Sequence, residues 1–296
     1  MVSVKSYAKL NISLKITGVS NGYHDLDSVV CSVDKYDLIT AKKRKDDKIL
    51  VSFKGKYGFI PKLQEETLAY KTAKAFIDGA GVKGVELTVY RNIPDGSGMG
   101  GSSADIAGVL TALKKLYKLN VNVEDLADLL GSDSKFMLNG GFARLQGRGN
   151  IIKPLNVNQN YYFIVIYSKI PVTAKESFSL YDELGAYSSS VDIDMVERGV
   201  LSGDLEVISK YGGNDLTESS IKLNGEIKRN LSALKDLSPA VCFMTGSGST
   251  CFSMYKEYEM ASWAYNKLKR TFGESVELLY SIEPNKPSFF DTLFKK

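Results

Sequence analysis

Apolar and polar positions alternate with a period of two through most of the first ninety residues, a pattern typical of β-strands with one buried face. Turn residues divide this region into separate segments. The pattern predicts strands over residues 6–16, 26–43 and 48–55.

A helical period interrupts these strands over residues 65–81. Its apolar face consists of Leu68, Thr72, Ala75 and Phe76. Gly79 and Gly81 mark the expected end of the helix, because glycine readily adopts the left-handed conformation of a helix C-cap.

A glycine-rich stretch, residues 93–105, lies between two regular elements. A strand is predicted before it over residues 82–93, and an apolar helix with a basic last turn after it over residues 102–119. A short helix follows over residues 122–131 with Asn122 as its cap, and residues 140–155 have the glycine-punctuated pattern of a hairpin.

From residue 156 the pattern restarts. The expected elements are a strand (161–169), a helix (173–184), two or three helices to Leu237, a strand–turn–strand unit (239–257), a helix (258–272) and a strand (275–283). Strands and helices are mixed without the regular alternation of a doubly wound sheet. We therefore expect an α+β fold in two domains, residues 1–155 and 156–296.

Composition indicates a globular protein, because 44% of the 296 residues are hydrophobic, 24% are charged, and no apolar run is long enough to cross a bilayer. The amino-terminal stretch alternates polar and apolar residues and lacks the apolar core of a signal peptide, so we expect a cytoplasmic protein. Cys31, Cys242 and Cys251 are widely spaced in apolar stretches and are interpreted as reduced core residues.

Charge argues against two further classes of function. The formal net charge of +4 is small for this length, and acids interrupt the basic cluster Lys42–Lys48, so a solvated hairpin loop is favoured over a nucleic-acid patch. His24 is the only histidine, which excludes a metal site built from several histidines. We expect neither a nucleic acid nor a membrane as a partner.

The glycine-rich stretch reads "IPDGSGMGGSSAD". Backbone N–H groups can converge on a phosphate only where no side chain intervenes, and glycine removes that obstacle. The helix that begins near Ser102 would add unpaired N–H groups and the positive end of its dipole. The stretch lacks the "GKS" or "GKT" of a Walker motif and fits the dinucleotide fingerprint poorly, so its spacing alone leaves a plain flexible turn as an alternative.

The same stretch resembles the P-x-x-x-G-L-G-S-S-A loop of the GHMP kinases, the small-molecule kinases of homoserine, mevalonate, galactose and relatives. The resemblance implies a two-domain GHMP kinase fold, with an N-terminal ribosomal-protein-like α/β domain and a C-terminal ferredoxin-like α/β domain. It also implies that ATP binds on this loop. The residues so assigned are Pro94, Gly96, Ser97, Gly98, Met99, Gly100, Gly101, Ser102 and Ser103.

Further stretches narrow the resemblance. "YAKLNISLKITGVSNGYHDLDSVV" looks like the opening of the branch of this family that phosphorylates a cytidyl alcohol in the non-mevalonate isoprenoid pathway. "GSDSKF" resembles the family's G-[AS]-D-[VI]-P-F and puts Asp133 in the place of the catalytic aspartate, with Lys135 where proline is usual. Thr67 stands where relatives commonly have an asparagine near the adenine pocket. "GNDLTESSIKLNGEI" and "MTGSGSTCF" follow in the family's order.

The resemblance gives Lys9 and Asp133 catalytic roles. Asp133 would take the proton of the acceptor hydroxyl, and Lys9 would offset charge beside it. Without the resemblance, Asp133 would be interpreted as a turn aspartate and Lys9 as a surface lysine. Asn11 lies on the same strand face as Lys9, because side chains two residues apart share a face, and it can donate to and accept from a polyol.

The remaining candidates bind substrate. A lone histidine is more often structural, but the resemblance makes His24 a reader of the cytosine edge, with Tyr23 shaping the same pocket. Tyr181 would stack on the base, and simple packing is its alternative. Gly246 and Gly248 would approach the substrate phosphates, and a tight hairpin is their alternative.

The expected function is ATP-dependent phosphorylation of a cytidyl alcohol, with ATP as co-substrate and Mg²⁺ accompanying it. The sequence shows no acidic pair that must hold the metal, so no metal ligand is assigned. Two alternatives stay open: a GHMP kinase of another small alcohol such as homoserine, and a nucleotide-binding protein without catalysis, prompted by Thr67 and Lys135. A monomer or a homodimer is expected.

Overall fold

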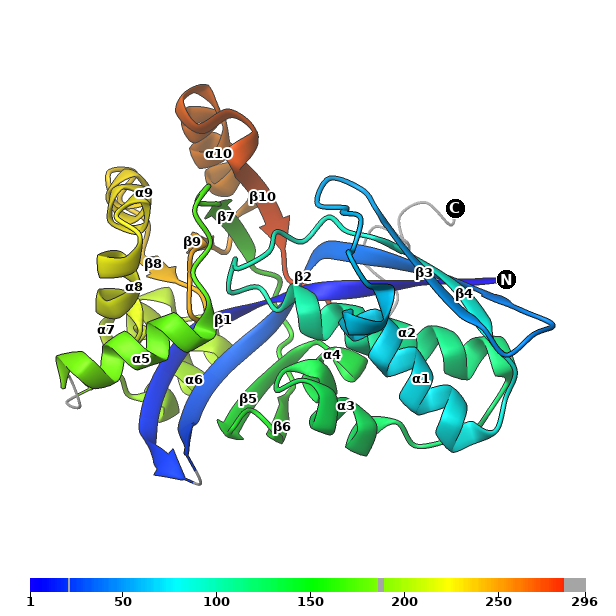
Figure 1. The fold of residues 1–296 in the computed structure, drawn as a ribbon. Coiled ribbons are helices and arrows are strands. Elements are labelled where there is room, and N and C mark those ends of the chain that lie inside the picture. The colour runs from blue at the N-terminus through cyan, green and yellow to red at the C-terminus, as the bar shows by residue number, and fades with distance from the viewer. Residues whose placement is uncertain (21, 186–188, 285–296) are drawn as a thin grey trace. The chain divides into compact units, whose positions relative to one another are not determined.

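Two long strands, β1 (Val2–Ser20) and β2 (Tyr23–Lys43), pair with each other and contribute residues to both compact units of the chain. The computed structural model describes residues 1–20, 22–185 and 189–284 (Figure 1). The first unit comprises residues 1–8, 35–95 and 100–139, and the second comprises residues 9–34, 96–99 and 140 onward. Both units interleave along the chain, and the expected domain boundary after residue 155 stays a prediction.

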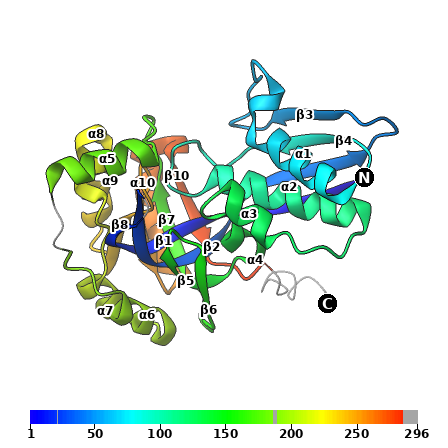
Figure 2. The same ribbon diagram turned by 60° about the horizontal axis from the view of Figure 1, so that its bottom comes forward.

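The first unit is a sheet with helices packed on it. Strand β4 (Val85–Tyr90) runs parallel to β3 (Ile49–Lys54) and antiparallel to the Leu38–Lys43 part of β2. The helices are η1 (Gln64–Glu66), α1 (Leu68–Ala80), α2 (Gly101–Tyr117), α3 (Glu124–Leu130) and α4 (Ser134–Asn139). Figures 1 and 2 show α1 and α2 side by side along this part of the sheet. Ile39, Leu87, Phe76 and Leu110 bring strand and helix side chains into one core.

Helix α1 follows the predicted helix with two corrections. Thr67 caps it, since its hydroxyl accepts a hydrogen bond from the backbone N–H of Tyr70, and Gly81 ends it in the left-handed conformation. Gly79 therefore lies inside the helix. Leu68, expected on the buried face, is 39% exposed, because the buried stripe is shifted by one residue around the helix. The buried residues are Ala69, Thr72, Ala73, Phe76 and Ile77.

The second unit contains an antiparallel sheet in the order β10–β7–β9–β8. Its strands are β7 (Tyr162–Ile166), β8 (Val241–Met244), β9 (Cys251–Tyr255) and β10 (Val276–Tyr280). The unit also pairs the Leu26–Cys31 part of β2 with β5 (Phe142–Gly147), and β5 with β6 (Ile151–Leu155), which confirms the predicted hairpin.

Besides its four-stranded sheet, the second unit contains helices. They are α5 (Ala174–Leu184), α6 (Ile193–Ser202), α7 (Leu205–Tyr211), α8 (Thr217–Leu223), α9 (Glu226–Lys235), α10 (Tyr258–Phe272) and η2 (Gly273–Ser275). Ile164 and Met244 of the sheet pack with Leu231 of α9 and Ala264 of α10. The described residues from 189 to Leu237 thus hold four helices, α6 to α9, where two or three were expected. The α10 range matches the prediction.

Strand β1 differs from the half-buried strand that its alternating pattern predicted. Every residue from Ala8 to Leu14 is buried, because the segment is covered on both faces. Lys9 and Asn11 are each only 5% exposed. The default interpretation of Lys9 as a surface lysine is therefore wrong, and its ammonium group needs polar partners inside the protein.

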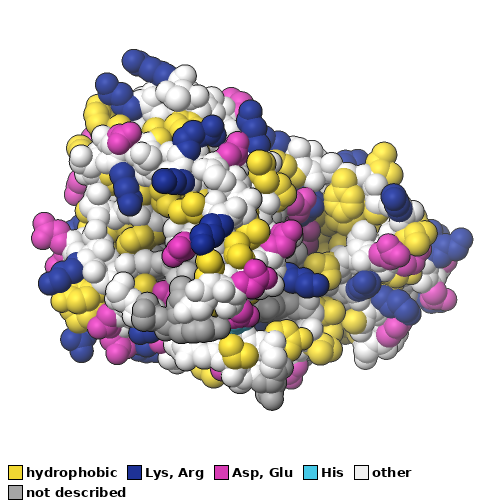
Figure 3. All heavy atoms as spheres, turned by 60° about the vertical axis from the view of Figure 1, so that its left-hand side comes forward, with side chains coloured by type: hydrophobic (Ala, Val, Ile, Leu, Met, Phe, Trp, Pro, Cys, Tyr) yellow, Lys and Arg dark blue, Asp and Glu magenta, His cyan; other side chains and the backbone are white. Residues whose placement is uncertain are grey.

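The cysteines of the folded protein are thiols, and its surface carries charged side chains of both signs. All three cysteines are free thiols, and burial raises the pKa of each, to about 12 for Cys242. On the face shown in Figure 3, Lys and Arg side chains are interspersed with Asp and Glu. Within the described ranges, no helix combines the length and the apolar character that crossing a bilayer requires.

Packing around α2 gives a test of the first unit. A Cβ at Gly108 would lie 2.4 Å from Cδ1 of Ile39 and 2.9 Å from Cβ of Ser6, so Gly108→Ala should destabilise the protein by about 1–3 kcal/mol through overpacking. Gly79→Ala is the control, because it meets no heavy atom within 4 Å and should stabilise α1 by about 0.5 kcal/mol. Urea denaturation of both variants measures this, and equal effects would contradict the packing.

Candidate active site

The glycine loop leads from β4 into α2 and has three residues with left-handed backbone. Gly96, Gly98 and Gly100 have φ values of 57°, 73° and 75°. Gly100 is also the N-cap residue of α2, so the helix begins directly after the loop. An L-residue with a side chain adopts this conformation at a cost, and glycine does not.

Close packing gives Gly98 a second reason to be glycine. Within the second unit, a Cβ at Gly98 would lie 2.2 Å from the carbonyl oxygen of Thr245, and one at Gly246 would lie 2.7 Å from the carbonyl oxygen of Gly98. The backbone N–H of Ser249 donates to the carbonyl of Gly96 at 3.1 Å, and that of Thr250 donates to the carbonyl of Ser97 at 3.2 Å. The glycine loop and the β8–β9 turn therefore form one backbone assembly, which brings Gly98, Gly246 and Gly248 together.

Lys9 and Asn11 join this assembly from β1. The backbone N–H of Lys9 donates to the carbonyl of Met99 at 3.1 Å, and that of Asn11 donates to the Thr245 hydroxyl at 2.8 Å. The Lys9 ammonium group donates to Oδ1 of Asn11, and Nδ2 of Asn11 donates to the Ser28 hydroxyl at 2.8 Å. The shared face predicted for Lys9 and Asn11 is confirmed. Because the Met99 side chain is fully buried, the loop can offer only its backbone at that position.

Two aromatic side chains of the second unit, Phe178 and Tyr181, contact His24 and form an aromatic group with it. Its imidazole stacks on the ring of Phe178 at a centroid distance of 4.6 Å and meets the buried Tyr181 edge-on at 6.3 Å. Nε2 of His24 lies 2.8 Å from Oδ1 of Asp182, which is partly exposed. The structure therefore brings His24 and Tyr181 together and adds Phe178, which sequence reasoning missed although it lies in the same predicted helix.

Tyr23, the residue before His24, lies more exposed at the edge of this region. The guanidinium of Arg148 lies 3.8 Å from the centroid of the Tyr23 ring, a cation–π contact. Arg148 comes from the turn between β5 and β6, and its position follows from the pairing of β2 with β5.

Asp133 belongs to the first unit, in the turn between α3 and α4. Its carbonyl accepts from the backbone N–H of Met137 at 3.0 Å, so it begins the short helix α4, which the sequence pattern did not predict. Its side chain is half-buried. A Cβ at Gly131 would lie 3.3 Å from the Ser103 hydroxyl, so this turn packs against the first turn of α2. Ser102 and Ser103 occupy that first turn.

Comparison with known proteins identifies the family. Residues 67–142 match the N-terminal domain of the GHMP kinases, and residues 196–274 match their C-terminal domain. A 4-diphosphocytidyl-2-C-methyl-D-erythritol kinase of Alkaliphilus metalliredigens is 33% identical over 90% of this chain and 92% of its own. The chain belongs to the GHMP kinase family. A relative of the same name from Clostridium tetani is 30% identical over 92% of this chain and 98% of its own.

Solved structures show the same fold. A crystal structure of 4-(cytidine 5'-diphospho)-2C-methyl-D-erythritol kinase aligns with a TM-score of 0.78 at 24% identity, covering 95% of this chain and all of that one. Homoserine kinase from Cytophaga hutchinsonii aligns with a TM-score of 0.71 at 19% identity and covers 95% of each chain. The expected α+β GHMP kinase fold is therefore confirmed, and members of the family use ATP as phosphate donor.

Two departures of this GHMP kinase from its family's pattern have local explanations. Lys135 lies in the first turn of α4, where backbone N–H groups have no partner within the helix, so lysine and proline both fit there. Thr67 donates its hydroxyl to the carbonyl of Gln64 at 2.6 Å and caps α1. Both residues are compatible with the backbone that the structure shows.

Asn214 is a residue that the site prediction missed. Its Nδ2 donates to the carbonyls of Met244 and Gly246, both at 2.8 Å, and its Oδ1 accepts from the backbone N–H of Leu216 at 3.0 Å. The buried amide thus fixes the β8–β9 turn. The segment "GNDLTE" was recognised as a family motif, but only the fold shows what its asparagine holds.

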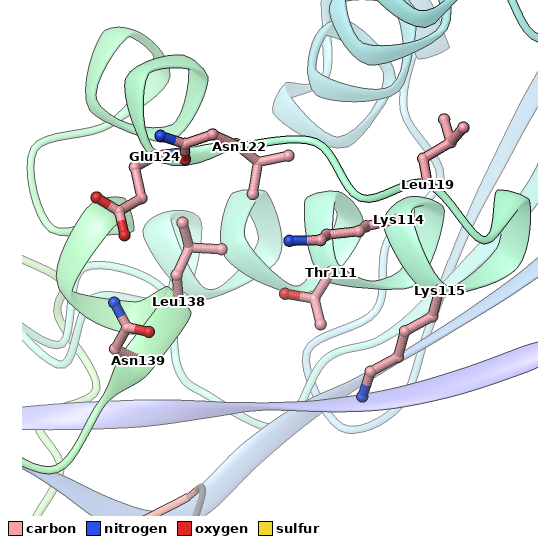
Figure 4. Close-up of a pocket in the computed structure, with 9 residues that line it drawn as sticks. Thr111, Lys114, Lys115, Leu119, Asn122, Glu124, Leu138 and Asn139 are labelled. Atoms are coloured by element: carbon pink, nitrogen blue, oxygen red, sulfur yellow. The ribbon is translucent and has the colours of Figure 1, made fainter.

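Two hollows border elements of the first unit. One of about 440 Å³ is formed by the C-terminal half of α2 with α3 and α4, and Figure 4 shows Lys114 pointing into it near Thr111 and Leu138. A second of about 280 Å³ borders β3 and α1. Neither is lined by a residue predicted for the site. Among the described residues, no group of three or more His, Cys, Asp or Glu side chains forms a metal cage.

The role of Asn214 is testable by Asn214→Asp. An aspartate accepts from Leu216 but cannot donate to the two carbonyls, so a buried charge would face two oxygens and the protein should lose about 3–5 kcal/mol of stability. Asn158→Asp, at an exposed position, should change it by less than about 0.5 kcal/mol. Thermal denaturation at neutral pH checks both, and similar melting temperatures for both variants would refute the role.

Proposed function

We propose that this GHMP kinase transfers the γ-phosphoryl group of ATP to the 2-hydroxyl of 4-diphosphocytidyl-2-C-methyl-D-erythritol, a step of non-mevalonate isoprenoid precursor synthesis. The relatives at 30–33% identity carry this name. The geometric observation that supports it is the hydrogen bond from the backbone N–H of Lys9 to the carbonyl of Met99, because it holds the backbone of this buried lysine against the glycine loop. A phosphoryl transfer site needs a cation and a phosphate-binding loop together.

The proposed chemistry forms one bond and breaks one. The oxygen of the 2-hydroxyl bonds to the γ-phosphorus, the bond from that phosphorus to the β–γ bridging oxygen breaks, and ADP leaves. Asp133 receives the hydroxyl proton as general base, and Lys9 offsets the charge of the transferring group. Asn11, held by Ser28 and bonded to Lys9, orients the hydroxyls of the acceptor.

Phosphates would bind on backbone N–H groups of the glycine loop and the first turn of α2. Gly100, Gly101, Ser102 and Ser103 begin this helix, whose dipole favours an anion at that end. The β8–β9 turn carries Gly246 and Gly248 next to Gly98, so substrate phosphates there would meet backbone rather than side chains. This proposal keeps a substrate-side role for that turn in addition to its packing role.

Cytosine recognition is proposed for the aromatic group around His24. Base rings bind by stacking on Tyr23, Phe178 or Tyr181, and a ring nitrogen of His24 reads the hydrogen-bonding edge. Asp182 bonds Nε2 of His24 and so orients the imidazole, leaving Nδ1 for the base.

Magnesium fits this site only as a companion of ATP. The described residues offer no cage of three or more acidic or histidine ligands, and Mg²⁺ commonly binds through substrate phosphates, waters and one or two protein oxygens. Bound to ATP, the metal would neutralise phosphate charge. The chain's own contribution is then the loop, Lys9 and Asp133.

Asp133→Asn tests the proposed base. The amide cannot accept the hydroxyl proton, so kcat should fall by about 10²–10⁴-fold while ATP still binds, measured as ADP release and by calorimetry. Asp128→Asn, an exposed aspartate on α3, is the matched control and should retain wild-type turnover. Equal turnover in wild type and Asp133→Asn would refute this assignment.

His24→Ala tests the acceptor. Loss of the imidazole should raise KM for the cytidyl substrate by about tenfold or more, since a good hydrogen bond and a stacking contact are lost, and leave KM for ATP nearly unchanged. A kinase of another alcohol such as homoserine would be insensitive to this change. Activity on homoserine that survives His24→Ala would therefore favour that alternative.

A further inference from the structure

Four charged side chains of the first unit gather at the two ends of the glycine loop. Arg91 follows β4, Asp95 directly precedes Gly96, Asp105 lies in α2, and Asp37 comes from β2. Asp37 and Asp105 are buried, and the Arg91 side chain is only 6% exposed. Buried charges are retained only where partners compensate them, so the arrangement of this cluster is informative.

Arg91 holds the end of the loop that leaves β4. Its Nη1 and Nη2 donate to the two carboxylate oxygens of Asp95 at 3.0 and 2.5 Å, the two-pronged geometry that suits guanidinium. Its backbone N–H donates to the carbonyl of Lys54 at 2.8 Å, so the anchor is part of the sheet. Asp95, which directly precedes Gly96, is thereby tied to β3 and β4.

The same guanidinium faces the end of the loop that enters α2. Nε of Arg91 lies 3.5 Å from Oδ2 of Asp105, close enough for an ion pair, although Nε has no hydrogen-bond partner in the described part of the chain. Asp37 completes the cluster, since its Oδ1 accepts from the backbone N–H groups of Asn92 and Ile93 at 2.5 and 2.9 Å. One arginine thus contacts carboxylates on both sides of the loop.

Asp37 and Asp105 influence each other's ionisation. Both carboxyls are buried, and Oδ2 of Asp37 and Oδ1 of Asp105 have no hydrogen-bond partner among the described residues. Two buried carboxyls that interact oppose each other's ionisation, which favours a proton on one of them. Burial raises the pKa of Asp105 most strongly, Arg91 lowers it, and Asp37 and Asp95 raise it again, to about 8.

We propose that Arg91 and the Asp37–Asp105 pair are positioning residues that fix both ends of the glycine loop for ATP binding. This rests on the proposed function of the loop as the ATP phosphate site. The residues do not touch the nucleotide in this proposal. They act by holding Asp95 at one end and the first turns of α2 at the other.

The cluster also sets a pH dependence. The charged groups that face Asp105 are Arg91 from the end of β4, Asp37 from β2 and Asp95 from the loop. Below about pH 8 Asp105 of α2 is protonated and can donate to Asp37 of β2. Above it, two buried carboxylates repel each other and weaken the hold on α2, so the affinity for ATP falls as the pH rises.

Hydrogen exchange in the absence of ATP tests whether the charged cluster holds the glycine loop in place. Arg91→Lys keeps the charge but loses the two-pronged contact, and amide exchange in residues 93–105 should speed up by about tenfold. Asp95→Asn, at a largely exposed side chain, should do the same if Arg91→Lys folds poorly. Arg44→Lys is the control, because it removes a similar two-pronged contact, to Asp46, in another loop. Unchanged exchange in Asp95→Asn would overturn the proposal.

The pH profile tests the link to ATP. In wild type, KM for ATP should rise by up to about tenfold per pH unit above pH 8, and in Asp105→Asn, whose amide donates to Asp37 at every pH, this rise should disappear. Values of KM at pH 7 should be similar in both. The same rise in wild type and Asp105→Asn would overturn the proposal.

These outcomes separate the inference from the proposed function. If the protein bound ATP with the expected pH dependence but phosphorylated no cytidyl alcohol, the proposed function would fail and the positioning role would stand. If turnover of the cytidyl alcohol were normal and the hydrogen exchange of Asp95→Asn unchanged, the positioning role would fail alone.

Discussion

The contact between two glycine turns of the second unit constrains much of the site. The carbonyl of Thr245 approaches Gly98 so closely that a Cβ there would lie 2.2 Å from its oxygen. Backbone hydrogen bonds from Ser249 and Thr250 to the carbonyls of Gly96 and Ser97 hold this approach. Because these carbonyls are satisfied by protein, their peptide units are fixed before any ligand arrives. The conformation of the loop therefore does not depend on phosphate to order it.

A strand covered on both faces makes the polar residues of the site possible. Lys9 and Asn11 lie in the part of β1 that has no solvent-exposed face, and an isolated ammonium group in such a place would be costly. Oδ1 of Asn11 accepts from Lys9, and Ser28 accepts from Asn11, so the polar groups satisfy one another. A buried hydrogen-bonded network is rigid, which suits the proposed role of Lys9 and Asn11 in aligning a hydroxyl with a phosphoryl group.

Local pattern predicted most strands and helices of this chain but few of its contacts. The period of two in residues 6–16 indicated a strand, yet that period cannot show that Ala8 to Leu14 is buried on both sides, since this depends on segments distant in the chain. Helix α4 was missed because six residues are too few for a periodic signal. Asn214 and Phe178 were missed for a related reason: an amide that holds a turn and a ring that stacks on histidine are defined by their partners, not by spacing.

Charge around the glycine loop poses a final physical problem. The loop proposed to bind ATP phosphates is flanked by Asp95 and Asp105, with Asp37 in the same cluster, and three ionised carboxylates would oppose an approaching polyanion. Arg91 compensates one of them, and burial raises the pKa of Asp105 to about 8, so a protonated Asp105 carries no charge at neutral pH. The cluster thereby keeps the rigidity of a buried ionic network at a net charge of about minus one, and the anchoring acids do not cancel the attraction of the α2 dipole for phosphate.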